Sequence, residues 1–170
     1  MEVSCSHIPI RYIMKGYDEM NTISYRKLEW QDISKFIGLR MCQLQEEGTE
    51  PIFDLTPSLY AYYDRHIADG TFVSWIAVNG DEIISTSGMS FVEKPPYYSN
   101  PSGKIGLLSS MYTLEPYRRK GIAKQLLDKV INEAKIYGCS AVHITASDMG
   151  VFLYKNYGFE YNGNFMQYKL

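Results

Sequence analysis

The sequence feature that most constrains the fold is a predicted strand that runs through a short basic turn into a long amphipathic helix. Residues 104–114 form the strand pattern, and residues 119–137 carry apolar side chains at helical spacing. Gly138 then ends the helix pattern, as glycine commonly does after the last helical residue. This order predicts a chain that mixes strands and helices, with a tight polar junction between one strand and the helix after it.

A second strong signal lies upstream, where the dipeptide Asn79-Gly80 joins two strand patterns. Residues 71–78 are rich in β-branched and aromatic side chains, and residues 82–92 supply the returning strand, so we expect an antiparallel hairpin. Residues 94–103 combine prolines with Gly, Asn and Ser. They are therefore predicted to form a long surface loop.

Shorter patterns complete the predicted order of elements. Asp32 and Thr56 are suitable N-terminal caps for two helices, and Pro57 suits a first helical position. The predicted elements are a strand at 21–28, helices at 32–47 and 56–68, the hairpin, the strand and helix described above, a strand at 140–145, a helix at 149–156, and a final hairpin of 159–161 and 164–169 over Asn162-Gly163.

Length and composition fit one globular domain and argue against non-specific nucleic-acid binding. A chain of 170 residues, with 45% hydrophobic and 21% charged residues, is long enough to bury one core. We expect that domain to span residues 21–170, and residues 1–20 to be an accessory arm or an over-long start. The net charge of −2 argues against non-specific binding of nucleic acid.

The compartment is predicted from segments that the sequence lacks. No apolar run approaches the roughly 18 residues that cross a bilayer, and the N-terminus has no apolar core with a cleavage site. The cysteines, Cys5, Cys42 and Cys139, do not have the spacing of zinc ligands. We therefore expect a cytoplasmic protein with no membrane, metal or nucleic-acid partner.

The junction between strand and helix has the physical properties of an anion site. In the segment Met111-Tyr-Thr-Leu-Glu-Pro-Tyr-Arg-Arg-Lys-Gly-Ile-Ala123, consecutive cations precede the glycine that opens the helix. A helix N-terminus offers unpaired N–H groups and about half an elementary positive charge. Gly121 permits close approach of a ligand, and the cations add charge. The same turn, taken alone, is also compatible with a solvated surface.

Two motifs resemble the signatures of the GNAT superfamily of N-acetyltransferases. Arg118-x-x-Gly121-x-Ala123 resembles the (Q/R)xxGx(G/A) motif, and Phe152-Leu-Tyr-Lys-Asn-Tyr-Gly-Phe159 resembles the LYxxxGF segment. The order of elements from residue 21 to 170 is also the family's order. The resemblance implies an α/β (α+β) GNAT fold, with a mixed, mostly antiparallel central sheet of about six to seven strands flanked by about four helices.

The resemblance also implies acetyl-coenzyme A (acetyl-CoA) as co-substrate and no metal. The pantetheine arm would pair with the backbone of Met111, Tyr112 and Thr113 at a bulge, and Ser147 stands where many members have an asparagine that contacts this arm. Tyr154 would protonate the leaving sulfur, and an N–H near Met111 would polarise the carbonyl. The pyrophosphate would contact the basic turn and the helix start, at Arg118, Arg119, Lys120, Gly121, Ile122, Ala123 and Lys124.

The general base is not assigned by the sequence, since residues 107–113 contain no carboxylate or histidine. Ser109, acting through water, and the carboxylates Glu46 and Glu47 are the candidates. His143 lies on an apolar strand, where a lone histidine is more often a sheet residue than a catalyst. The resemblance places the acceptor cleft along the first two helices and the 94–103 loop, with these wall candidates: Glu46, Glu47, Tyr60, Tyr63, Tyr97 and Tyr98.

The main interpretation is an N-acetyltransferase in which a primary amine of a small molecule or protein attacks the thioester directly. A coenzyme A-binding sensor without turnover is the alternative, because no base is evident. A nucleic-acid module that uses residues 118–120 is disfavoured by the acidic balance of the chain. The resemblance also admits a homodimer.

Overall fold

The computed structural model describes residues 23–161, 163 and 166–168. The predicted N-terminal arm, residues 1–20, lies outside them. In chain order the elements are β1 (Ser24–Lys27), the 3₁₀ turn η3 (Trp30–Asp32), α1 (Ile33–Glu46), α2 (Thr56–Ala68), β2 (Phe72–Asn79), β3 (Glu82–Glu93), β4 (Lys104–Thr113), the 3₁₀ turn η4 (Glu115–Tyr117), α3 (Ile122–Tyr137), β5 (Ala141–His143) and α4 (Asp148–Tyr157).

The strands form one mixed sheet in the order β1-β2-β3-β4-β5. The first four strands pair antiparallel with their neighbours, and β5 runs parallel to β4. Asn79 pairs with Glu82 and closes the hairpin that the sequence predicts. A parallel pair needs a long crossover connection, and α3 lies in it. The predicted fold class, a mixed and mostly antiparallel sheet flanked by helices, is confirmed.

The predicted strand count is too high, because the chain after α4 forms no strand in the part that the structure describes. Residues 159–161 and 166–168 have no strand pairing, and residues 162, 164–165 and 169–170 of the predicted final hairpin lie outside the described residues. The Phe159 N–H instead donates to the Tyr154 carbonyl at 2.9 Å. This bond belongs to the C-terminal cap of α4, which competes with strand pairing for the same backbone group.

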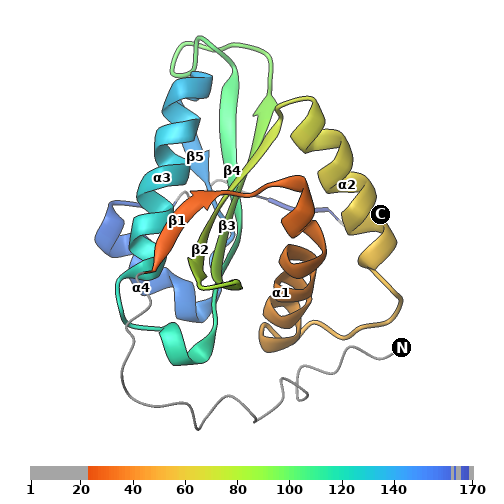
Figure 1. The fold of residues 1–170 in the computed structure, drawn as a ribbon. Coiled ribbons are helices and arrows are strands. Elements are labelled where there is room, and N and C mark those ends of the chain that lie inside the picture. Colours follow the sequence, from red (N-terminus) through yellow and green to blue (C-terminus); the bar gives the residue numbers. More distant parts are fainter. Residues whose placement is uncertain (1–22, 162, 164–165, 169–170) are drawn as a thin grey trace, which may run out of the picture.

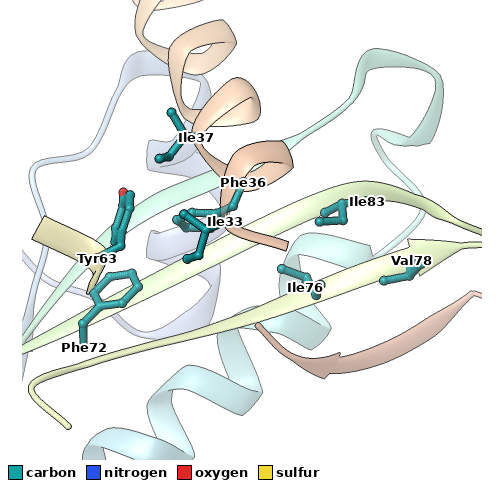
Figure 2. Packing of buried hydrophobic residues seen from close by; sticks show 8 residues of the cluster. All are labelled: Ile33, Phe36, Ile37, Tyr63, Phe72, Ile76, Val78 and Ile83. Atoms are coloured by element: carbon teal, nitrogen blue, oxygen red, sulfur yellow. The ribbon is translucent and has the colours of Figure 1, made fainter. Parts of the chain in front are cut away.

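One side of the sheet is covered by α1 and α2, and the other side by α3 and α4 (Figure 1). On the first side, Phe36 and Ile33 of α1 are completely buried against side chains of β2 and β3 (Figure 2). The rings of Phe36 and Tyr63 meet edge to face, with centroids 5.0 Å apart. This cluster fixes both helices to the first half of the sheet.

The opposite side is organised by the apolar stripe of α3. Leu126, Leu127 and Val130 are fully buried, while Ile136 on the same helix is 73% exposed. This helical periodicity agrees with the amphipathic pattern in the sequence. The buried stripe holds the N-terminus of α3 near the end of β4. In the part of the chain that the structure describes, no helix is long and apolar enough to span a membrane.

Candidate functional site

A β-bulge interrupts β4 in the middle of the sheet. Gly88 of β3 pairs with Ser109 and Thr86 pairs with Tyr112, so two residues of β4, Ser110 and Met111, stand opposite Ser87 alone. Ser110 has a positive φ of 51°, an uncommon conformation for a residue other than glycine. A bulge leaves one residue out of the ladder and bends the strand. The bulge expected near Met111 is therefore present.

Beyond the bulge, one edge of β4 has no partner strand among the described residues. The β4–β5 ladder ends where Leu107 pairs with His143, yet β4 continues to Thr113. An unpaired strand edge presents N–H and C=O groups to any extended ligand beside it. The predicted pantetheine contacts, Met111, Tyr112 and Thr113, all lie on this part of β4.

The unpaired edge leads into the basic turn at the start of α3. Arg119 and Gly121 both have positive φ values, 60° and 78°. The Gln125 N–H donates to the Gly121 carbonyl at 3.2 Å, so the N–H groups of the residues between them have no acceptor within the helix. A Cβ added at Gly121 would meet no atom within 4 Å, so there is open space on that side of Gly121. This arrangement suits an anion.

The cations of the turn differ in their surroundings. Arg119 and Lys120 are exposed, and the Lys120 ammonium lies 5.4 Å from the Tyr117 ring centroid. Lys124 is also exposed and forms an ion pair with Asp128 at 3.2 Å. Two further members of the predicted site are less exposed: Ile122 is buried in the core and Ala123 is half-buried.

The Arg118 side chain forms a cluster with Glu46 and Tyr112. Its Nη2 donates to Glu46 Oε2 at 2.6 Å, and its Nε donates to the Thr113 carbonyl at 2.8 Å. The Tyr112 hydroxyl donates to the other carboxylate oxygen, Oε1, at 2.6 Å. Burial opposes ionisation of Glu46, but the bonds from Tyr112 and Arg118 outweigh it and lower the pKa of the carboxyl. Sequence reasoning missed this cluster, because no local pattern relates Glu46 to residues so far along the chain.

Tyr154 is buried on α4, with 6% of its surface exposed. Burial first, and then the negative charge of Glu47, raise the pKa of its hydroxyl to about 12. Ser147 precedes α4, where its carbonyl accepts the N–H of Gly150 at 2.9 Å and its side chain makes no cap hydrogen bond. The Ser147 hydroxyl is thus available for another partner.

The candidates for the general base differ in their hydrogen bonds and exposure. Glu46 has both carboxylate oxygens engaged, whereas Glu47 is exposed and accepts a hydrogen bond from Gln43 Nε2 at 3.0 Å. Ser109 lies on β4 beside the bulge and is half-buried. His143 is exposed on β5 rather than buried in the sheet. Of these candidates, Ser109 lies beside the bulge, and the charge of Glu47 acts on Tyr154.

The tyrosines predicted to line an acceptor cleft differ in their exposure. Tyr63 is a core residue, 3% exposed, and burial raises the pKa of its hydroxyl. Its assignment to a cleft wall is therefore wrong. Tyr60 is half-buried and shares a short hydrogen bond with Ser34. Tyr97 and Tyr98, in the loop between β3 and β4, are strongly exposed.

The chain resembles known acetyltransferases in sequence and in structure. The model of the Acetyltransferase (GNAT) family matches residues 38–159. An uncharacterized N-acetyltransferase of Bacillus subtilis (strain 168), YsnE, is 29% identical over 143 residues, which cover 80% of this chain and 89% of that relative.

Solved structures extend this likeness to the fold. A predicted acetyltransferase from Clostridium acetobutylicum, solved with acetyl-CoA, matches with a TM-score of 0.84 and 35% identity, over 86% of this chain and 96% of that one. The aminoglycoside N-acetyltransferase AAC(6')-Iy, in complex with CoA, matches with a TM-score of 0.70 and 20% identity, over 87% of this chain and 94% of that one. At 20% identity, the likeness to AAC(6')-Iy concerns the fold alone.

Proposed function

Because the chain belongs to the GNAT family of acetyltransferases, we propose that it transfers the acetyl group of acetyl-CoA to a primary amine of a small molecule or a protein. The observation that carries this proposal is the edge of β4 from the bulge at Ser110 to Thr113, which has no partner strand among the described residues and is followed by the basic turn at Gly121. The Clostridium acetobutylicum structure, 35% identical to this chain, contains acetyl-CoA. We transfer that ligand to this chain as its co-substrate.

The β4 edge and the α3 start are suited to the two ends of the proposed co-substrate. The extended pantetheine arm is proposed to pair with the backbone from Met111 to Thr113, and the Ser147 hydroxyl to approach it from α4. The pyrophosphate is proposed to accept hydrogen bonds from backbone N–H groups between Arg119 and Lys124. The exposed side chains of Arg119 and Lys120 add positive charge there.

The proposed reaction is direct attack of the neutral amine on the thioester. A new C–N bond forms as the C–S bond breaks, the amine loses one proton, and the departing thiolate gains one. An N–H at the bulge, near Met111, is proposed to donate to the carbonyl oxygen as negative charge develops there. Tyr154 is proposed to protonate the sulfur, since its raised pKa keeps the hydroxyl protonated at neutral pH.

The proton of the amine is proposed to leave through Ser109 and water, with Glu47 as the carboxylate that finally accepts it. Glu46 is excluded from this role by its surroundings, because a carboxylate with a lowered pKa and two occupied oxygens is a weak proton acceptor. Glu47 has no such partners on both oxygens among the described residues, and its charge acts on Tyr154.

A coenzyme A-binding protein without turnover is the second candidate. The observation that favours it is the composition of β4 around the bulge, where Ser109 and Ser110 supply hydroxyls but no residue from 107 to 113 supplies a carboxylate or imidazole. Such a protein would bind acetyl-CoA as tightly as an enzyme does, but it would release no thiol in the presence of amines.

Thiol release from acetyl-CoA, measured across polyamines, aminoglycosides, amino acids and short peptides, tests this proposal. Gly121→Ala introduces only backbone strain at a positive φ, whereas Gly121→Glu also places negative charge beside the proposed pyrophosphate site. We expect turnover on one class of amine, a modest loss in Gly121→Ala, and a loss of at least about tenfold in kcat/KM in Gly121→Glu. Tyr154→Phe should lower kcat with little change in the affinity for acetyl-CoA.

The outcomes separate the two candidates. Tight binding of acetyl-CoA without turnover on any amine would favour the binding protein. Equal activity of the two Gly121 variants would show that the anion does not approach this turn.

A further inference from the structure

One carboxylate joins three segments of the proposed site. Glu46 is the last residue of α1, Tyr112 follows the bulge in β4, and Arg118 directly precedes the basic turn. We call the cluster of Glu46, Tyr112 and Arg118 the carboxylate clamp. Its two bonds to Glu46 are both 2.6 Å, and a third bond, from Arg118 Nε to the Thr113 carbonyl, is 2.8 Å. Charge-assisted hydrogen bonds of this length fix the geometry of the groups that they join.

The clamp engages the Nε–Nη2 side of the Arg118 guanidinium, which is one of the sides through which arginine binds a phosphate with two parallel hydrogen bonds. Its Nε and Nη2 are both directed at protein acceptors, and its Cζ lies 5.6 Å from the Tyr112 ring centroid. The charge of Glu46 also compensates that of the guanidinium at close range. Arg119 and Lys120, which are exposed, have no such ion pair among the described residues. Arg118 thus differs from its neighbours in the turn.

We expect the clamp to fix the relative positions of the three segments more than to raise the free energy of unfolding. The side chains of Arg118 and Glu46 are 31% and 37% exposed, so water screens their attraction and reduces what the pair adds to the free energy of unfolding. The three segments that it joins, however, carry the proposed acceptor side, the proposed pantetheine edge and the proposed pyrophosphate turn. A small displacement among such segments can change a reaction rate strongly.

We propose that Glu46 is a positioning residue that holds the end of α1, the strand after the bulge and the basic turn in one arrangement, and that Arg118 acts through Glu46 rather than as a phosphate ligand. This inference rests on the proposed function for its kinetic readout. It assigns Arg118, which the motif resemblance places among the cofactor contacts, to a contact with α1.

Two thioesters distinguish the two roles of Arg118. Acetyl-CoA has the pyrophosphate, and acetyl-pantetheine lacks it. If Arg118 acts through Glu46, then Arg118→Met and Glu46→Ala lower kcat/KM by a similar factor, about tenfold, with both thioesters. The double variant should lose no more than the more impaired single variant, because both changes break one cluster. Glu46→Gln, which keeps an acceptor for Tyr112, should restore part of the activity.

A phosphate ligand would behave differently. If the loss in Arg118→Met were confined to acetyl-CoA, or if the effects of Arg118→Met and Glu46→Ala multiplied in the double variant, the proposal would be overturned. Glu93→Gln is the matched control, since Glu93 contributes to another ion pair, with Lys104 at 4.0 Å, and is expected to leave kcat/KM unchanged. Melting temperatures confirm that each variant is folded.

A failure of the proposed function can be told apart from a failure of the clamp. If the wild-type protein binds acetyl-CoA but acetylates no amine, the dissociation constants of both thioesters, measured by calorimetry, replace the kinetic readout. Parallel weakening of both ligands in Arg118→Met and Glu46→Ala supports the clamp even then. Weakening of acetyl-CoA alone overturns it.

Discussion

At the scale of single residues, the proposed acid Tyr154 depends on the small size of Gly150. The two residues are one helical turn apart on α4, and a Cβ added at position 150 would lie 2.7 Å from Tyr154 Cε2. The ring is buried and contacts Phe159 edge to face, with centroids 5.6 Å apart. Because neighbours surround it, the ring cannot yield to an added methyl group without moving its hydroxyl.

We therefore expect Gly150→Ala to lower kcat by about tenfold while the protein remains folded. The variant keeps the Tyr154 hydroxyl and displaces it, so thiol-release kinetics beside Tyr154→Phe compare a misplaced acid with an absent one. Gly38→Ala in α1 is the matched control, because a Cβ there meets nothing within 4 Å. That control should keep its activity and gain up to about 1 kcal/mol of stability. Unchanged kcat in Gly150→Ala would mean that the ring position is unimportant for catalysis.

At the scale of elements, α3 combines two roles. Its apolar stripe is buried against the sheet, and its first turn begins at the left-handed Gly121 with N–H groups that have no acceptor within the helix. The stripe therefore positions the proposed anion site, since the helix cannot shift without disrupting its buried contacts. Leu126 lies close to that end of the helix and is completely buried.

Leu126→Ala is expected to reduce the free energy of unfolding by about 2–5 kcal/mol, through lost burial and the cavity that remains. Ile136→Ala on the same helix is the control, because Ile136 is 73% exposed and its truncation should change stability by no more than about 0.5 kcal/mol. Urea unfolding followed by circular dichroism measures both. Equal effects of the two substitutions would contradict the assignment of the buried face.

At the scale of the whole molecule, α1 and α4 lie on opposite sides of the sheet (Figure 1). A tyrosine with a raised pKa is found on each side: Tyr112 of β4 donates a hydrogen bond to Glu46 of α1, and Tyr154 of α4 belongs to the core cluster that Met111 packs against. Burial, followed by the hydrogen bond to Glu46, raises the pKa of Tyr112 to about 12. Burial, followed by the charge of Glu47, raises that of Tyr154 to about 12. Both hydroxyls are therefore proton donors in the folded protein over the neutral range.

This predicts a loss of stability in alkali. Above about pH 10 the unfolded chain releases the protons of both tyrosines while the folded protein retains them, so the free energy of unfolding falls as the pH rises toward 12. Urea unfolding at about pH 8, 10 and 11 measures the slope. Tyr154→Phe should make the slope shallower. Tyr98→Phe, at a fully exposed residue, should leave it unchanged, and a wild-type slope of zero would contradict the prediction.

The sequence allowed much of the fold to be predicted, because its signals are local. Asn79-Gly80 predicts a tight antiparallel connection through backbone preference alone, and Gly138 ends α3 with a positive φ as expected. The final hairpin was predicted from an equally local signal, Asn162-Gly163. In the described residues that follow α4, however, the Phe159 N–H is already used by the helix cap.

The site was only partly predictable, because local signals do not show which distant residues meet in the fold. The spacing of Arg118, Gly121 and Ala123 locates the turn, and the structure places it at the start of α3. The spacing gives no information on where the Arg118 side chain points, since its partner Glu46 lies in another helix. No glycine or other turn-forming residue marks the bulge at Ser110 in the sequence. It depends on pairing with β3.

Local patterns predicted the order of strands and helices as far as α4, the end of α3 at Gly138 and the glycine at the basic turn, because these depend on neighbouring residues and backbone preference. The predicted caps were wrong in detail: Asp32 makes no side-chain cap bond to α1, and Leu55 rather than Thr56 is the N-cap of α2. The partner of Arg118, the burial of Tyr63 and the close approach of Tyr154 to Gly150 depend instead on how the elements pack together. Tyr63 and Arg118 meet residues that are distant in sequence. Gly150 is close to Tyr154 in sequence, but the Tyr154 ring lies against Gly150 because other elements surround the ring. Such arrangements are set by the packing of several elements at once, which a local pattern does not specify.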